Sequence, residues 1–167
     1  MSRGGLGHLF AKAALNLYPP YRGSGARVLR IAPDFHEIEV RIPLTWKTRN
    51  LVGTMFGGSM YTACDPIYML MLKQMLGDGY VVWDKAATIR FLKPGTTGLT
   101  ATFVIAEPEA REVKALLEER PSLDRTYSVE LKDDAGQVCA VVEKLLYVAK
   151  ARAGNRQKVR SIYSRLF

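Results

Sequence analysis

The chain of 167 residues has the length of one ordinary domain, and its 48% apolar and 24% charged residues exclude a disordered or collagen-like chain. The net charge of +8 is typical of proteins that bind nucleic acid or anionic membranes. However, all sixteen acidic residues precede Ala149, so residues 1–149 carry 18 basic against 16 acidic residues, and the other six basic residues follow. We therefore expect a nearly neutral domain followed by a basic tail, which argues against nucleic-acid binding by the domain.

The cysteines and histidines argue against a disulfide framework and against a metal cluster. Cys64 and Cys139 are far apart, and His8 and His36 are the only imidazoles. We expect two reduced thiols, no metal and no cofactor. Residues 8–17 are too short and too polar for a secretion signal, and no run of eighteen apolar residues exists. The sequence thus favours a cytoplasmic protein without a transmembrane segment.

Hydrophobic periodicity predicts the elements in chain order. Apolar residues at helical spacing predict an amphipathic helix over residues 6–17, which Tyr18-Pro19-Pro20 ends. Residues 27–32 and 37–42 are predicted strands, the second with clear polar–apolar alternation. Residues 59–76 are apolar on almost every side, which predicts a buried helix that ends at Gly77-Asp78-Gly79.

The second half of the chain is dominated by predicted strands. They cover residues 80–82, continuing through 83–85 into 87–92, then 99–106, a helical insertion at 107–119, and a hairpin of 125–132 and 137–149 turning at 133–136. A short terminal helix is predicted at 159–167. The order indicates an α+β fold, an antiparallel sheet wrapped around one long buried helix. We divide the chain into an N-terminal helix and linker (1–24), the main domain (25–149) and a basic tail (150–167).

The segment 50–65 carries the most specific pattern. Asn50, Phe56-Gly57-Gly58 and Asp65 have the spacing of the Asn, His-Gly-Gly and Asp in hotdog-fold acyl-CoA thioesterases of the phenylacetyl-CoA type, with Phe56 in place of the His. The run 89–95 resembles the family's Phe-Leu-Arg-Pro strand end. Gly53–Gly58, with Asp65-Pro66 and Trp83-Asp84-Lys85, resembles more closely an uncharacterised bacterial branch of these proteins. The resemblance covers residues 25–149 and implies the hotdog fold.

By this resemblance the chain would hydrolyse an acyl thioester, with acyl-CoA as the expected substrate. It would act as a homodimer or homotetramer whose sites lie at the subunit interface. Phe56 departs from the family pattern, because a phenyl ring can shape a pocket but cannot position a thioester through hydrogen bonds.

The glycine pair and Asp65 have plausible chemical roles of their own. Gly57 and Gly58 stand where the buried helix should begin, and the unpaired amides and positive dipole end of a first helical turn stabilise an oxyanion. Close helix–sheet packing is the alternative for these glycines. A carboxylate in an apolar helix is costly unless it faces a cavity or partner, and by resemblance Asp65 acts as base or nucleophile. The alternative is that Asp65 serves only as a local hydrogen-bonding partner at the kink that Pro66 makes in the helix.

Further residues are candidates for substrate contact. By resemblance Asn50 orients the attacking species, although a satisfied loop Asn is an alternative. Thr54, Phe56 and Ser59 are expected to line the substrate site. Arg90 and Lys93, with Lys47 and Arg49, are candidates for the phosphates of coenzyme A, or else solvated strand-end charges.

Asp84 and Lys85 point to opposite faces of a strand, so one of them faces inward and needs a partner, which we expect across the dimer.

Two other functions stay open. The Phe56 departure favours a non-catalytic acyl-CoA-binding module. Separately, the cations of the tail alternate with Ile162, Tyr163, Leu166 and Phe167, as in a helix that binds anionic membranes or nucleic acid.

Overall fold

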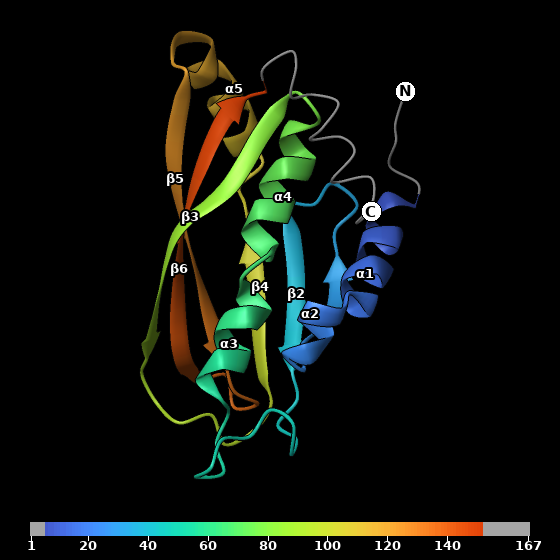
Figure 1. Cartoon of the computed structure of the whole chain (residues 1–167), viewed down its shortest axis with the longest axis vertical. Helices are drawn as coiled ribbons and strands as arrows, with labels where there is room; N and C mark the ends of the chain where they lie inside the picture. The colour runs from blue at the N-terminus through green and yellow to red at the C-terminus, as the bar shows by residue number, and fades with distance from the viewer. Residues whose placement is uncertain (1–5, 152–167) are drawn as a thin grey trace.

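The computed structural model describes residues 6–151, and within them one antiparallel six-stranded sheet encloses a central helical column (Figure 1). The strand order is β1-β2-β4-β5-β6-β3. The predicted α+β class, with its sheet around a buried helix, is confirmed. The elements are α1 (Gly7–Leu17), α2 (Pro19–Gly23), β1 (Arg27–Ile31), β2 (Glu37–Ile42), α3 (Gly57–Cys64), α4 (Ile67–Leu76), β3 (Tyr80–Phe91), β4 (Leu99–Val104), α5 (Glu109–Glu119), β5 (Ser122–Lys132) and β6 (Val138–Lys150).

β2 has the predicted bounds and the predicted alternation. The two segments predicted around residues 80–92 form one continuous strand, β3, which is interrupted only by a bulge between Asp84 and Ala86. β3 lies at one edge of the sheet and pairs with β6, and from Trp83 to Phe91 every residue except Ile89 is exposed. This long edge strand therefore offers its free side to solvent.

The predicted central helix is divided into α3 and α4, which Figure 1 shows as one column along the inner face of the sheet. The break falls at Asp65-Pro66, because proline has no N–H to donate to the carbonyl of the preceding turn. α3 begins at Gly57, and α4 ends at Leu76. The next residue, Gly77, has a φ of 88°, a positive value that glycine readily adopts directly after a helix. Pro66 thus places Asp65 at a helix junction instead of inside a helix.

The N-terminal helices close the opposite side of the sheet. α1 has the predicted position, but Pro19-Pro20 also begins the short helix α2, since proline is well suited to a first helical turn. The buried Tyr21 donates its hydroxyl to the carbonyl of Ala63 at 3.2 Å, which joins α2 to α3. The Asn16 amide exchanges hydrogen bonds of 3.0 and 2.9 Å with the backbone of Val28 on β1. This edge is therefore partly covered.

The helical insertion is confirmed as α5, and the turn at 133–136 joins β5 to β6 as predicted. The terminal helix predicted at 159–167 and nearly all of the basic tail lie outside the described residues. Between residues 6 and 151, no helix is both long and apolar enough to cross a membrane.

Candidate functional site

Asp65 lies at the junction of α3 and α4, with about half of its side chain (47%) exposed. Its Oδ1 accepts two hydrogen bonds, from Nζ of Lys144 at 2.7 Å and from the hydroxyl of Tyr61 at 3.1 Å. Within residues 6–151, no hydrogen bond or ion pair engages the other oxygen, Oδ2. The carboxylate is therefore held on one side and open on the other.

Lys144 is the partner that sequence reasoning missed. It lies on β6 with its side chain fully buried (0% exposed), and its Nζ also lies 3.0 Å from Oδ1 of Asp84 on β3. The sequence does contain a pattern that indicates it, because Lys144 alternates with Val142 and Leu146 on the face of the strand that points to the core.

Asp84 is the inward member of its pair, and Lys85 lies on the other face with Asp124 at 2.6 Å. The expected partner across a dimer is thus corrected: Asp84 pairs within its own chain, with Lys144.

Burial changes the acid–base properties of this cluster. The pKa of the Asp84 carboxyl is raised because burial disfavours its charged form more than Lys144 stabilises it. Burial also raises the pKa of the neighbouring Cys64 thiol to about 12. A thiol that keeps its proton at neutral pH is a poor nucleophile. The reactive candidate here is therefore the Asp65 carboxylate.

The second group of predicted residues lies at the start of α3. Phe56 is the N-cap and makes no side-chain capping hydrogen bond. The Met60 amide bonds back to the Phe56 carbonyl at 3.2 Å, so helix geometry leaves the amides of Gly57 and Gly58 without intrahelical partners. A Cβ on Gly57 would lie 2.8 Å from the ring of Phe91, and one on Gly58 would lie 2.4 Å from the ring of Phe56. Two exposed aromatic rings thus lie close over the glycines.

A hollow of about 410 Å³ opens beside this helix start, lined among others by Asn50, Thr54, Gly57 and Lys93. Asn50 is engaged inside its own loop: its Nδ2 donates to Oγ1 of Thr54 at 2.9 Å, and its Oδ1 accepts from the Thr54 amide at 3.0 Å. It therefore shapes the loop that leads into α3. Ser59, in the first turn, is buried.

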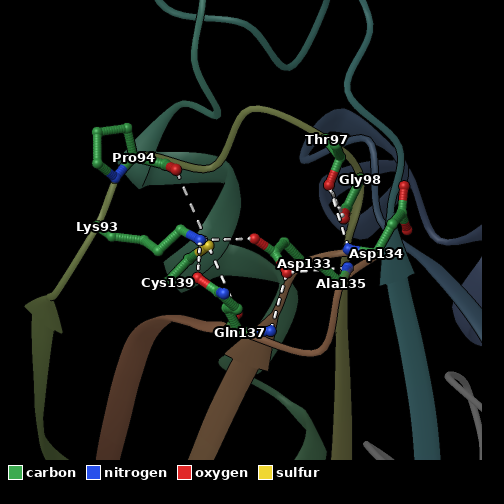
Figure 2. A network of polar contacts seen from close by, with 9 residues as sticks. All are labelled: Lys93, Pro94, Thr97, Gly98, Asp133, Asp134, Ala135, Gln137 and Cys139. Carbon is green, nitrogen blue, oxygen red and sulfur yellow. Dashed lines mark hydrogen bonds and ion pairs between the residues drawn. The ribbon is translucent and has the colours of Figure 1, made fainter.

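The two predicted phosphate-binding residues, Lys93 and Arg90, have different surroundings. Figure 2 shows Lys93 reaching to the turn between β5 and β6, where its Nζ lies 2.9 Å from Oδ2 of Asp133 and also donates to Gln137. The charge of Lys93 is thus largely compensated inside the chain. Arg90 is exposed on the edge strand β3.

A larger hollow of about 660 Å³ lies between the N-terminal helices and the loop after β2. Arg22, Arg27, Lys47 and Trp46 line it, none of its described lining residues is acidic, and Trp46 is 82% exposed. An intermediate hollow of about 570 Å³ shares Lys47 with it and shares Asn50 with the hollow at Gly57. We call these three neighbouring hollows, which are linked by shared lining residues, the surface track. Sequence reasoning did not include Arg22 or Arg27 in it.

The predicted catalytic residues fall into two groups on one helix. Gly57, Gly58 and the loop residue Asn50 lie at the start of α3, and Asp65 lies at its end. At 1.5 Å of rise per residue, Gly57 and Asp65 are separated by about 12 Å along the axis. One chain does not bring both groups to the same reacting carbonyl. Among the described residues, no cluster of His, Cys, Asp and Glu suited to holding a metal ion occurs.

Comparisons with known proteins find one matching family model and solved structures of similar fold. Residues 7–148 match the family model "Domain of unknown function (DUF4442)". A comparison with curated proteins finds no match. Among solved structures, PA5026 of Pseudomonas aeruginosa, a protein of unknown function described as a probable thioesterase, is 18% identical. The match covers 90% of this chain and 100% of that one, with a TM-score of 0.80.

Two further structures are similar at lower TM-scores. The thioesterase HI1161 of Haemophilus influenzae is 16% identical over 81% of this chain and 86% of its own, with a TM-score of 0.61. A mutant of the thioesterase PA1618 of Pseudomonas aeruginosa is 11% identical over 89% of this chain and 98% of its own, with a TM-score of 0.64. At these identities the likeness concerns the fold.

Proposed function

The chain belongs to the DUF4442 family and has the hotdog fold that the sequence resemblance implied, and from this premise we propose that it hydrolyses an acyl thioester. Similar structures named as thioesterases support hydrolysis in general terms. The observation that carries the proposal is Asp65, a half-exposed carboxylate in a largely apolar helical column, with Oδ1 held by two donors and Oδ2 open. An oriented carboxylate is suited to act as base or nucleophile.

In this proposal Oδ2 of Asp65 accepts a proton from water as the water oxygen attacks the thioester carbonyl carbon. The negative charge that develops on the carbonyl oxygen is stabilised by the amides of Gly57 and Gly58 and by the helix dipole. The carbon–sulfur bond then breaks, and the thiolate leaves and takes up a proton. Alternatively, Oδ2 attacks the carbonyl carbon itself, the carbon–sulfur bond breaks, and the thiolate leaves and takes up a proton. Water then hydrolyses the resulting anhydride and regenerates the Asp65 carboxylate. The rings of Phe56 and Phe91 supply apolar walls beside these amides.

The distance between Gly57 and Asp65 favours a site shared by two chains. The edge strand β3 is twelve residues long and exposed on most of its length, whereas the opposite edge is partly covered by Asn16. A long open edge strand is suited to pair with a second copy of itself. We therefore propose a homodimer through β3, in which Asp65 of one chain serves the α3 start of the other.

A charged edge should disrupt this assembly. We expect Ala86→Glu/Thr88→Glu, two exposed positions near the middle of β3, to give a monomer, because like charges then oppose each other across the paired strands. Because each proposed site needs both chains, the rate of thioester hydrolysis should fall at least about tenfold when the dimer is lost. Sedimentation velocity and turnover check this. The matched control is Leu29→Glu on the opposite edge strand β1, and a dimeric, active double variant would contradict the proposed interface.

We propose acyl-CoA as the substrate, supported by the surface track that leads from Gly57 toward the 660 Å³ hollow. Arg22, Arg27 and Lys47 offer charge for the phosphates of a nucleotide, and the indole of Trp46 offers a face for an adenine ring. In this arrangement the acyl thioester lies at α3 and the nucleotide end lies near α2. Lys93, which is engaged with Asp133, has at most a secondary part in phosphate binding.

If coenzyme A carries the acyl group, removing the cations that would bind its phosphates should raise the KM. Arg22→Gln/Arg27→Gln should raise the KM for acyl-CoA by about tenfold and leave kcat unchanged, because the lost contacts are made equally in the ground and transition states. The KM for the same acyl group on pantetheine, which has no phosphates, should stay the same. Arg120→Gln, at the end of α5, is the matched control. An equal effect on both substrates would exclude this nucleotide site.

A non-catalytic acyl-CoA-binding module is the second candidate, favoured by Phe56 in place of the family's His. The deciding experiment is release of free thiol from a panel of acyl-CoAs by the wild type, alongside binding of the same compounds. Turnover supports the proposed hydrolase. Binding without turnover on any compound favours the module.

A further inference from the structure

The most unusual residue of the core is a lysine. Lys144 occupies an inward position of β6, with Val142 and Leu146 on the same face, and its side chain has no exposed area. An ammonium group in such a place is costly unless it is paired, and apolar side chains of similar volume commonly serve stability as well or better. Stability alone therefore does not explain a lysine here.

The contacts of Lys144 connect it to the candidate catalytic carboxylate. Its Nζ lies 2.7 Å from Oδ1 of Asp65 and 3.0 Å from Oδ1 of Asp84, and 5.4 Å from the ring centre of Tyr61. Desolvation, the largest influence, lowers the pKa of Lys144, but the bonds to both carboxylates outweigh it and raise the pKa above its usual value. Lys144 therefore acts as a fixed cationic donor and not as a nucleophilic amine.

We propose that Lys144 and Asp84 are positioning residues for Asp65, an inference that rests on the proposed thioester hydrolysis. Lys144 binds Oδ1 and so directs Oδ2 toward the reacting carbonyl. Asp84, on a different strand, binds the same ammonium and fixes where it sits. The three side chains come from the helix junction, β3 and β6, so the direction of Asp65 is set by the packed sheet as well as by its own helix.

The charge of the cluster gives this inference a distinct signature. Two carboxylates share one ammonium. Among the residues that the structure describes, the other titratable groups that face them are Tyr61 and Cys64 of α3, which are neutral at pH 7 because their pKa values are raised. Without Lys144, two carboxylates would face each other uncompensated, and such a pair retains a proton to higher pH. A catalytic carboxylate that must be ionised would then become active only at higher pH.

The test compares Lys144→Met with Lys73→Met, which replaces the other buried lysine of the described core. Nζ of Lys73 donates to the carbonyl oxygen of Gly77, directly after α4, and to that of Tyr80, the first residue of β3. For Lys144→Met we expect kcat to fall about 10- to 100-fold with KM within about twofold, and the acid limb of the kcat/KM profile to move up by about one pH unit. Lys73→Met should leave the shape of that profile unchanged.

A second substitution tests the charge argument. Adding Asp84→Asn to Lys144→Met removes one of the two carboxylates, so the acid limb should return toward that of the wild type and part of kcat should recover. A uniform loss of rate at every pH, without rescue by Asp84→Asn, would overturn the inference. If Lys144→Met does not fold, Lys144→Gln, which keeps a donor but no charge, is measured in its place. The criteria are then the shift of the acid limb and its reversal by Asp84→Asn.

A measurement without turnover separates this inference from the proposed function. Carboxyl carbon NMR follows the titration of Asp65 in the wild type and in Lys144→Met. A midpoint at higher pH in the variant supports the positioning role, and an unchanged midpoint overturns it. A wild type that hydrolyses no thioester contradicts the proposed function instead.

Discussion

Replacing Asp65 by asparagine is expected to lower kcat for thioester hydrolysis by about 10²- to 10⁴-fold, the usual contribution of a positioned acid–base group. Asparagine has nearly the same shape and retains an oxygen that can accept from Lys144 and Tyr61, so the fold should survive. The amide can neither take a proton from water nor attack a carbonyl carbon. Because substrate is bound mainly by other residues, KM should change little. Thiol release from acyl-CoA under single-turnover and steady-state conditions measures the effect.

The matched control for this variant is Asp124→Asn, which removes an exposed carboxylate paired with Lys85 on the outer face of the sheet. It should retain wild-type kcat. An Asp65→Asn protein that is folded and as active as this control would exclude Asp65 as base or nucleophile and leave only its role at the helix junction.

The second large effect is expected at the start of α3. Gly57→Val should reduce kcat/KM by about 10²- to 10³-fold, the scale seen when one oxyanion donor is lost. Its side chain would occupy the space between the first-turn amides and the Phe91 ring, since even a Cβ would lie 2.8 Å from that ring. The ring is exposed and can turn outward, so the helix should still form.

Gly7→Val is the matched control for Gly57→Val, because Gly7 is likewise the first residue of its helix, and a Cβ there would meet nothing within 4 Å. The measurement is kcat/KM for acyl-CoA hydrolysis, together with the melting temperature of each variant. Equal small effects of both substitutions would mean that the α3 amides do not contact the reacting carbonyl.

The fold could be predicted largely from local patterns. Alternation in residues 37–42 reproduced β2, and the glycines before the apolar run marked the start of the central helix. The pattern predicts one helix over residues 59–76 with a kink at Pro66, whereas the structure has two helices that meet there, because the effect of the missing proline N–H is larger than a kink. The short helix α2 is not predicted, because Pro19-Pro20 indicates the end of the preceding helix, although proline also favours the first turn of a helix.

The candidate site was predictable only in part, because its partners come from distant strands. Asp65 is predicted from the cost of a carboxylate in an apolar helix. Of Asp84 and Lys85, the sequence predicts only that one faces inward, and the structure identifies it as Asp84. Their common partner, Lys144, is 79 residues from Asp65. The pairing of β3 with β6 brings Lys144 near Asp84, and the packing of the helical column against the sheet brings it to Asp65. The cation-lined hollow depends similarly on α2 lying beside the loop after β2.

The most direct test of a hydrolytic site shared between two chains is a mixed dimer. Asp65→Asn and Gly57→Val chains are each expected to be nearly inactive alone. Equal amounts of the two are either unfolded and refolded together or co-expressed in one cell, so that mixed dimers form. A mixed dimer holds one complete site, with Gly57 from one chain and Asp65 from the other. We predict recovery of about one quarter of the wild-type activity, since half of the dimers are mixed and each has one of two sites intact. No recovery in a verified mixed dimer would contradict the shared site.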